Sequence, residues 1–246
     1  MKDKSKHFGL LGRNISYSFS KGYFEEKFEK ENLHGFTYEN YDIQDIADFR
    51  AISQKNLKGL NVTIPYKEAI IPFLDKLSKT ATEIGAVNTI KFTKKGKLKG
   101  YNTDFYGFKN SLLPLLKPEH KRALILGTGG ASKGVAYALL QLGIEYTFVS
   151  RTPGSNNLNY TDLSKEIFNN YQIVINCSPI GTTPNIDLSP DLPYEYFTSA
   201  HIAYDLIYNP SQTLFLQKAE QAGATVKNGL DMLVWQAEKA WEIWNK

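Results

Sequence analysis

The feature that most constrains the fold is the stretch from Lys121 to Thr152. It begins with a short apolar run at 123–126, which leads into a turn made of Gly127, Thr128, Gly129, Gly130 and Ala131. Apolar residues then recur at helical spacing, and a second run rich in aromatic and β-branched residues follows at 146–149. Strand, glycine turn, helix and strand in this order predict a βαβ unit that binds a dinucleotide.

The turn has the physical properties that a pyrophosphate site requires. Glycine at 127 permits a tight turn, and glycine at 129 lets the backbone approach the anion closely. The helix N-terminus that follows offers N–H groups and the positive end of its dipole. The G-x-G-x-x-G pattern is incomplete, because Ser132 stands at its third glycine position. An ordinary α/β connection can contain such a turn, but the order of the elements favours nucleotide binding.

The end of the second strand indicates which cofactor binds. An NAD site places a carboxylate there for the ribose 2′-hydroxyl. This chain has Ser150, Arg151 and Thr152 instead, and no Asp or Glu occurs between 146 and 161. The Arg151 guanidinium can pair with a 2′-phosphate, although a solvated arginine also fits a strand end. We therefore expect NADP(H).

Composition narrows the class of protein. The 246 residues suffice for one large or two modest domains, and 42% of them are apolar. The formal net charge is +4 and no basic run is interleaved with aromatics, so we expect no nucleic-acid partner. The apolar patch at 8–11 is too short for a signal core and no segment could span a bilayer, so we expect a cytoplasmic protein without membrane contact.

The cysteine and histidine content argues against disulfide and metal chemistry. The single cysteine, Cys177, excludes an intramolecular disulfide and lies in an apolar run, where a buried small residue is expected. The four histidines are scattered without metal-ligand spacing, so no metal is expected.

Polar residues follow the expected strands of the first half. The segment 60–64 alternates apolar and polar residues as a strand does, and Pro65 ends it, so that Lys67 lies just past its carboxyl end. Ligands of open α/β sheets bind at that edge. We expect helices at 43–52 and 68–77.

A second polar cluster follows a hairpin whose turn is expected at 94–96. Asn88 opens the first strand of this hairpin, and Asn102-Thr103-Asp104 follows the second. Asp104 fits a cap of the helix that runs on through Leu112, and Lys67 taken alone fits a surface charge. Further strands are expected at 173–175 and 201–208, a loop at 156–159, and helices at 213–222 and 230–244.

Taken together, several motifs resemble the shikimate dehydrogenase family. They occur in the family's order, and the resemblance covers nearly the whole chain. These motifs are the hydroxyl pair Ser16 and Ser18, Asn61-Val-Thr63-x-Pro-x-Lys67, Gly85-Ala-Val-Asn88-Thr, Asn102-Thr-Asp104 and the glycine turn. The chain departs from the pattern at Ile15 and Phe19, which flank the serines where the family has His and Pro. It also has Ser150 where the family has Asn, and it lacks the basic residue that often follows.

The resemblance implies two α/β domains. The expected substrate domain, with a mixed sheet, comprises 1–116 and 230–246, and a Rossmann-type NADP-binding domain comprises 117–229, with the C-terminal helix returning to the first domain. The implied activity is the reversible NADPH-dependent reduction of 3-dehydroshikimate to shikimate in aromatic amino acid (chorismate) biosynthesis. The expected partner is this small-molecule substrate, and the expected state is a monomer or homodimer.

The resemblance also implies the roles of individual residues. Lys67 and Asp104 would be catalytic, since an ammonium group can stabilise charge on the ketone oxygen and deliver a proton while a carboxylate holds it in place. The implied substrate-binding residues are Ser16, Ser18, Asn61, Thr63, Asn88, Tyr208 and Gln236. The implied cofactor-binding residues are Gly127, Thr128, Gly129, Gly130, Ala131, Ser150, Arg151, Thr152, Leu206 and Gly229.

Two other functions fit parts of the pattern. A quinate/shikimate dehydrogenase would share every motif, so the sequence separates the two activities poorly. A non-catalytic NADP(H)-sensing module would keep the glycine turn and Arg151 but would have no use for Lys67 together with Asp104. The presence of both residues favours an enzyme.

Overall fold

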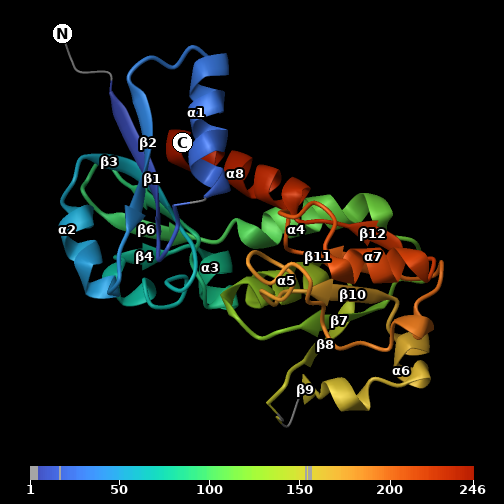
Figure 1. The fold of residues 1–246 in the computed structure, drawn as a ribbon. Coiled ribbons are helices and arrows are strands. Elements are labelled where there is room, and N and C mark those ends of the chain that lie inside the picture. The colour runs from blue at the N-terminus through green and yellow to red at the C-terminus, as the bar shows by residue number, and fades with distance from the viewer. Residues whose placement is uncertain (1–4, 17, 153, 155–156) are drawn as a thin grey trace. The chain divides into compact units, whose positions relative to one another are not determined.

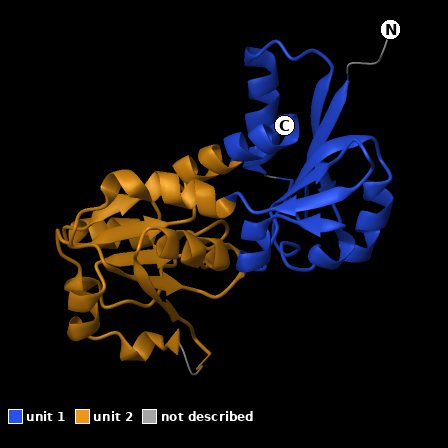
Figure 2. Cartoon of the chain, turned by 180° about the vertical axis from the view of Figure 1, so that it is seen from behind, with its two compact units in different colours: residues 1–103, 237–246 blue, residues 104–236 orange. Residues whose placement is uncertain are grey.

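The computed structural model describes residues 5–16, 18–152, 154 and 157–246. The chain divides into two compact units, one of residues 1–103 and 237–246 and the other of residues 104–236 (Figure 2). The sequence predicts domain boundaries at 116/117 and 229/230, which differ from the boundaries of these units at 103/104 and 236/237. The predicted domain boundaries stay a prediction.

The first unit contains a six-stranded mixed sheet with the strand order β2-β1-β3-β5-β6-β4. Its strands are β1 (Lys6–Gly12), β2 (Phe36–Asp42), β3 (Leu57–Val62), β4 (Lys76–Leu77), β5 (Thr89–Phe92) and β6 (Leu98–Tyr101). β1, β2 and β3 run parallel, whereas β5 is antiparallel to both β3 and β6. The hairpin expected at 94–96 joins β5 to β6, and Gly96 takes a positive φ of 73° in its turn.

The helices of the first unit are short, apart from α1. They are α1 (Phe19–Lys30), η1 (Ile46–Asp48), α2 (Phe49–Ser53), η2 (Ile71–Phe73) and α3 (Lys79–Ile84). The helix expected at 43–52 begins later, as η1 followed by α2. The helix expected at 68–77 is wrong: this segment forms turns, η2 and β4. Pro72 lacks an N–H for a longer helix, and the Asp75 carboxylate instead accepts from Leu98 N at 2.8 Å.

The last helix, α8 (Leu230–Asn245), completes the core of the first unit. Trp244 fills the space where a Cβ at Gly59 would stand, and its Nε1 donates to Ile90 O at 3.0 Å. Phe24 stacks on Tyr38 with ring centroids 4.7 Å apart in the same apolar cluster. Bare backbone at 59 therefore lets the end of the chain dock directly on β3.

The second unit contains a six-stranded sheet, all parallel, with the order β12-β11-β10-β7-β8-β9 (Figure 1). Its strands are β7 (Arg122–Leu126), β8 (Glu145–Val149), β9 (Asn157–Leu158), β10 (Ile173–Asn176), β11 (Ile202–Asp205) and β12 (Thr225–Lys227). The loop expected at 156–159 therefore contains β9, while Asn156 lies outside the described residues.

Helices cover both faces of this sheet. They are α4 (Asp104–Leu112), η3 (Leu113–Leu115), α5 (Gly130–Gln141), η4 (Tyr160–Asp162), α6 (Lys165–Asn170), η5 (Tyr194–Tyr196) and α7 (Leu214–Gln221). Ala123 and Ile125 of β7 pack with α4 and α5, whereas Leu124 and Leu126 pack with α6 and α7. Strict alternation along a strand buried on both sides explains why β7 reads as a continuous apolar run.

Among the described residues, no helix combines the length and the apolar character that crossing a bilayer requires.

Candidate active site

The loop after β1 is held in shape by one carboxylate. Asp42, at the end of β2, accepts from Asn14 N at 2.9 Å and from Ile15 N at 3.1 Å. Ser16 follows as an exposed residue, and Ser18 caps α1, its hydroxyl accepting from Ser20 N at 3.2 Å. The two hydroxyls named from the sequence thus lie in a loop that β1 and β2 fix at the carboxyl edge of the sheet.

Asn61 lies in β3 and is almost fully buried. Its Oδ1 accepts from Tyr38 Oη at 2.7 Å, and its Nδ2 donates to Asn88 O and to Thr89 Oγ1, each at 3.3 Å. The side chain therefore joins β2, β3 and β5. Sequence reasoning did not predict Tyr38 as its partner, because the contact depends on strand register.

Asn88 precedes β5 and is the centre of a second set of buried hydrogen bonds. Its Oδ1 accepts from Thr103 N at 2.7 Å, and its Nδ2 donates to Thr103 Oγ1 at 3.0 Å. Thr89 Oγ1 also donates to Asn88 Oδ1 at 3.2 Å. We call Asn61, Asn88, Thr89 and Thr103 the amide network.

Lys67 and Thr63 belong to the loop that leaves β3. Thr63 N donates to Leu11 O at 2.9 Å, and the Thr63 methyl group lies where a Cβ at Gly12 would stand. Lys67 is half-buried, and its carbonyl accepts from Val87 N at 2.7 Å. The backbone of Lys67 is thus fixed beside the segment that leads to Asn88, so the six expected site residues of this unit lie at one edge of the sheet.

Asp104 and Gln236 belong to the second unit and are both buried. Asp104 is the first residue of α4, where a carboxylate interacts favourably with the helix dipole. Gln236 lies on α8 with its Cβ 3.1 Å from the position of a Cβ at Gly107 of α4, and its Nε2 donates to Leu233 O at 3.0 Å. The pairing of Asp104 with Lys67 joins residues of different units and stays a prediction.

The glycine turn has the conformation that the sequence predicts. Gly127 takes a φ of 101° and its N donates to Val149 O at 3.0 Å. Gly129 caps α5 with open space on the side where a Cβ would point. Buried Ser132, at the third glycine position, donates from Oγ to Gly129 O at 2.6 Å and so tightens the first turn of the helix. Thr128 and Gly129 are exposed, which leaves the turn open to an anion.

The residues after β8, where a 2′-phosphate would bind, are largely exposed to solvent. Arg151 and Thr152 are exposed, while Ser150 is half-buried and accepts from Thr152 N at 3.2 Å on its Oγ. Burial raises the pKa of Tyr160, and the charge of Arg151 opposes that shift, which places the guanidinium near η4. A cationic end of β8 without a carboxylate fits a phosphorylated ribose.

Sequence reasoning missed a buried carboxylate at the ends of β10 and β11. Asp205 Oδ1 accepts from Asn176 Nδ2 at 3.1 Å and from Ile207 N at 3.0 Å, and Oδ2 accepts from Thr213 Oγ1 at 2.6 Å. Burial raises the pKa of Asp205 to about 6, although these hydrogen bonds oppose the shift. The Asn176 Oδ1 atom in turn accepts from Ser178 N at 3.0 Å. We call Asp205, Asn176, Ser178 and Thr213 the carboxylate network.

The carboxylate network holds the segment that carries three expected site residues. Leu206 N donates to Asn176 O at 3.0 Å, and Gly229 N donates to Ile207 O at 3.1 Å. A Cβ at Gly229 would overlap the carbonyl oxygen of Leu206, so these two positions are in close contact and only glycine fits. Tyr208 follows as a half-buried residue. The sequence gives one indication of this network: Asp205 ends an apolar strand and is followed by two more apolar residues.

Comparisons with known proteins agree with the sequence motifs. Residues 10–90 match the family model described as the shikimate dehydrogenase substrate binding domain. A curated relative from Caldanaerobacter subterraneus subsp. tengcongensis, named shikimate dehydrogenase (NADP(+)), is 36% identical over 98% of this chain and 91% of its own length.

Solved structures show the same similarity in three dimensions. A shikimate dehydrogenase from Aquifex aeolicus superposes with a TM-score of 0.88 at 33% identity, covering 100% of this chain and 94% of the other. A shikimate 5-dehydrogenase from Thermus thermophilus, solved in complex with NADP(H) and shikimate, gives a TM-score of 0.86 at 32% identity over 97% and 93% of the two chains.

Proposed function

Because the chain belongs to the shikimate dehydrogenase family, we propose that it catalyses the reversible NADPH-dependent reduction of 3-dehydroshikimate to shikimate in aromatic amino acid (chorismate) biosynthesis. The observation that carries this proposal is the 36% identity with a shikimate dehydrogenase (NADP(+)) over 98% of the chain. The open glycine turn and the polar carboxyl edge of the first sheet agree with it.

The residues of the second unit fit NADP(H). The backbone at Gly129 and the N-terminus of α5 would receive the pyrophosphate, since nothing occupies the side where a Cβ would point. Arg151 would pair with the 2′-phosphate through its planar fork. Leu206 and Gly229, held by the carboxylate network, would lie beside the nicotinamide. When bound, NADPH supplies a hydride to the keto carbon of the substrate.

The residues of the first unit would bind and orient the substrate. The exposed hydroxyl of Ser16, with Ser18, would donate to the substrate carboxylate. Asn61 and Asn88 already use their amides in the amide network, so they would fix the wall against which the ring hydroxyls lie. Thr63, with Tyr208 and Gln236 of the second unit, would complete these contacts.

Lys67 would be the general acid for reduction. Negative charge develops on the ketone oxygen as the carbon is reduced, and the ammonium group at Nζ would stabilise that charge and transfer a proton to the oxygen. Asp104 would hold the ammonium group in place. In the reverse direction the neutral amine would take the proton back from the hydroxyl.

The activity is tested by measuring NADP⁺ reduction with shikimate, with quinate and without either acid, and again with NAD⁺. The proposal expects turnover with shikimate and NADP⁺. Preferred turnover of quinate would assign the chain to the quinate/shikimate alternative. Cofactor binding without turnover of either acid would support the NADP(H)-sensing module instead.

The role of Lys67 is tested by Lys67→Ala, which should lower kcat for shikimate oxidation by about 10² to 10⁴-fold. Lys79→Ala, which removes an exposed lysine of the same unit, is the matched control and should leave kcat unchanged. If kcat of Lys67→Ala stayed within a factor of two of the parent value, the general-acid role of Lys67 would be wrong. Asp104→Asn should lower kcat as well. An unchanged kcat would mean that Asp104 only stabilises the N-terminus of α4 and has no catalytic role.

A further inference from the structure

Three lysines form a row across neighbouring strands of the first sheet, away from the proposed active site. Lys91 of β5 is directly opposite Lys99 of β6, and Lys99 is in turn paired in register with Lys76 of β4. Residues paired in this way point to the same face of the sheet. Like charges directly opposite one another destabilise a sheet. The Lys99 ammonium group offsets part of this cost by lying over the Tyr101 ring, 5.2 Å from its centroid.

The contacts of these side chains agree on which face they occupy. Gly59 of β3 is the next position in register beyond Lys91, and Trp244 of α8 covers it. Lys91 Nζ donates to Ile243 O, the residue before that tryptophan, at 2.8 Å. Burial, together with the ammonium groups of Lys94, Lys99 and Lys246, lowers the pKa of Lys91. The row therefore lies on the face of the sheet that α8 covers, with further ammonium groups close to Lys91.

The lysine row forms part of a groove of about 1040 Å³ whose charged lining residues are all lysines. These ten lysines are Lys6, Lys55, Lys58, Lys76, Lys91, Lys94, Lys95, Lys97, Lys99 and Lys246. The formal net charge of the chain is +4, so the rest of the chain carries −6 once these ten are set aside. The positive charge is concentrated here rather than spread over the surface.

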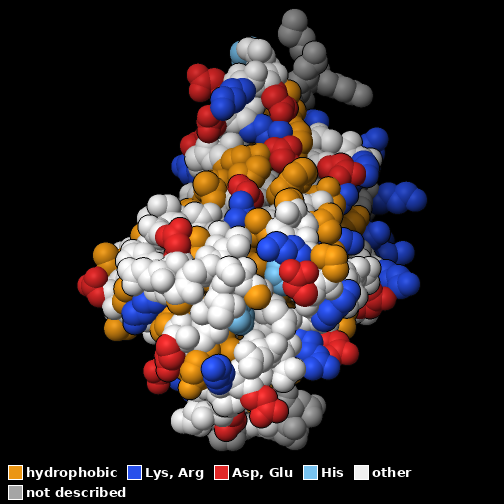
Figure 3. Space-filling view, turned by 90° about the vertical axis from the view of Figure 1, so that its right-hand side faces the viewer, with side chains coloured by type: hydrophobic (Ala, Val, Ile, Leu, Met, Phe, Trp, Pro, Cys, Tyr) orange, Lys and Arg blue, Asp and Glu red, His pale blue; other side chains and the backbone are white. Residues whose placement is uncertain are grey.

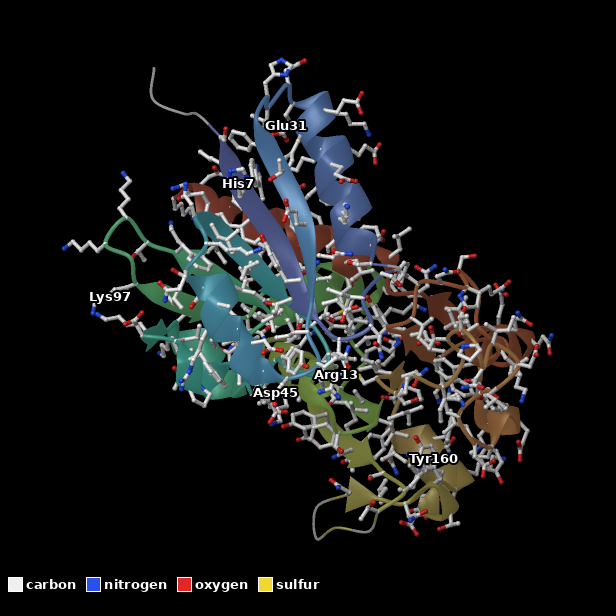
Figure 4. The ribbon with its side chains drawn as sticks, turned by 60° about the vertical axis from the view of Figure 1, so that its left-hand side comes forward. His7, Arg13, Glu31, Asp45, Lys97 and Tyr160 are labelled. Atoms are coloured by element: carbon white, nitrogen blue, oxygen red, sulfur yellow. The ribbon has the colours of Figure 1, made fainter. Side chains whose placement is uncertain are left out.

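Two carboxylates near the groove already have partners. Asp75 accepts from Leu98 N, and Glu242 is paired with Lys246 and Lys239. Among the described residues, none of the other nine lysines of the groove lies within ion-pair distance of a carboxylate. Lys97 extends outward from the β5–β6 hairpin in Figure 4, and basic side chains gather along the right-hand edge of Figure 3. The groove therefore offers ammonium groups to an external anion.

The chemistry of the lining favours a compact anion over a nucleic acid. A single strand needs exposed aromatic rings on which bases stack. Of the two aromatic residues that line the groove, Trp244 is only 7% exposed with its indole donating to the backbone, and Phe92 is half-buried against an apolar cluster. None of the described residues that line the groove is an arginine, the side chain suited to bidentate recognition. Neighbouring strands are about 4.8 Å apart, so the row of three spans only about 10 Å. Lysines are compact charges on flexible stems, which suits several adjacent phosphate groups.

We propose that the lysine row binds a polyphosphate chain of at least three phosphoryl groups, carried either by inorganic tripolyphosphate or by a nucleoside triphosphate. A bound polyphosphate would lower the repulsion between the neighbouring ammonium groups, and this gain would contribute to its affinity. This site is separate from the proposed dehydrogenase site and does not depend on that activity.

The test is calorimetric titration of the full chain with tripolyphosphate and with ATP at 150 mM salt. Binding should weaken about 30-fold in Lys91→Gln/Lys99→Gln, since each ammonium–phosphate contact is worth roughly five- to tenfold. The matched control Lys21→Gln/Lys165→Gln removes two exposed lysines outside the groove and should change affinity less than about twofold. Equal affinity for both ligands assigns recognition to the phosphate chain, and tighter ATP binding that the groove variant still weakens assigns it to a nucleotide.

Thermal unfolding provides a second readout that does not need the affinity to be high. Without anion, Lys99→Gln should raise Tm because it removes the central charge of the row. With tripolyphosphate, Tm of the parent should rise beyond the rise in sodium chloride of equal ionic strength, and the variant should lose that excess. The proposal is wrong if the parent shows no excess, if the groove variants retain it, or if polyglutamate or single-stranded DNA of matched charge binds more tightly.

Discussion

The two units fix the loops at the carboxyl edges of their sheets with chemically different buried networks. In each, a buried set of polar side chains fixes the loops at the carboxyl edge of a sheet. In the first unit the amide network, centred on Asn88, consists of amides and hydroxyls. In the second, the carboxylate network is centred on Asp205, whose pKa is raised to about 6 by burial. Only the second network can change its charge near neutral pH.

This difference separates two demands on a buried polar cluster. A neutral network is satisfied at every pH, so its hydrogen bonds depend only on geometry. A buried carboxylate accepts stronger hydrogen bonds but carries a desolvation cost whenever it is ionised. The hydrogen bonds of the amide network should therefore be insensitive to mild acid, whereas the contribution of the carboxylate network to stability should vary with pH. Hydrogen exchange at the amides of β5 and β11 reports the two units separately.

The largest expected effect is the loss of the central amide. Asn88→Leu removes the acceptor of the buried Thr103 N–H and the bonds to two hydroxyls, and should destabilise the first unit by about 4 kcal/mol. Hydrogen exchange in β5 should report the same loss at pH 5 and at pH 7. Asn245→Leu, at an exposed position, is the control. A loss that varies with pH would show that the amide network is coupled to a titrating group.

The next effect concerns pH. The pKa of Asp205 is higher in the folded chain than the ordinary value of 3.8, so the folded state binds more protons between about pH 4 and pH 6. Stability of the second unit should therefore fall as pH rises through this window, by about 3 kcal/mol in all. Urea unfolding of the parent and of Asp205→Asn across the window measures this contribution as their difference. Parallel curves would contradict the raised pKa.

A smaller effect is expected at Thr213, which donates to Asp205 and also caps α7. Thr213→Val should destabilise the second unit by about 2 kcal/mol at pH 7 and by less at pH 4, where the carboxyl group is protonated. Thr213→Ser keeps the hydroxyl and should stay near the parent. Hydrogen exchange in β11 measures both. An equal loss at the two pH values would assign the whole effect to the helix cap.

The smallest effect is expected for Asp205→Asn at pH 7. The amide keeps an acceptor for Ile207 N and a polar group facing Thr213, and it removes the desolvation cost of the charge, so the free energy of unfolding should change by less than about 1 kcal/mol. Urea unfolding measures it. A loss above about 3 kcal/mol would mean that the charge itself holds the loops together.

The parts of the fold that follow from local pattern could be predicted from sequence. Apolar runs gave the strands at 123–126 and 173–175, and glycines at 96 and 127 marked turns that need a positive φ. The helix expected at 68–77 failed because its apolar residues resemble a helical face while Pro72 and the partner strand β6 favour turns and β4. A two-residue strand has no pattern of its own.

The residues expected at the site come from the resemblance, and their roles stay a prediction. The structure places two of them, Asn61 and Asn88, together in one network. Asp42, Tyr38 and Asp205 were missed, because their contacts depend on strand register and on burial, which the sequence does not encode locally. The lysine row was missed for the same reason: Lys76, Lys91 and Lys99 become neighbours only once the strands are paired.

The position of α8 has a consequence for biosynthesis. Ala237, Ala240 and Trp244 pack in the same apolar cluster as Phe8 and Phe24, so the core of the first unit includes residues that follow the whole second unit in sequence. Residues 1–103 are synthesised before residues 104–236, and the residues of α8 that join the first unit follow both, whereas the second unit is one uninterrupted segment. The first unit should therefore complete its hydrophobic interior only after all of the second unit has been synthesised.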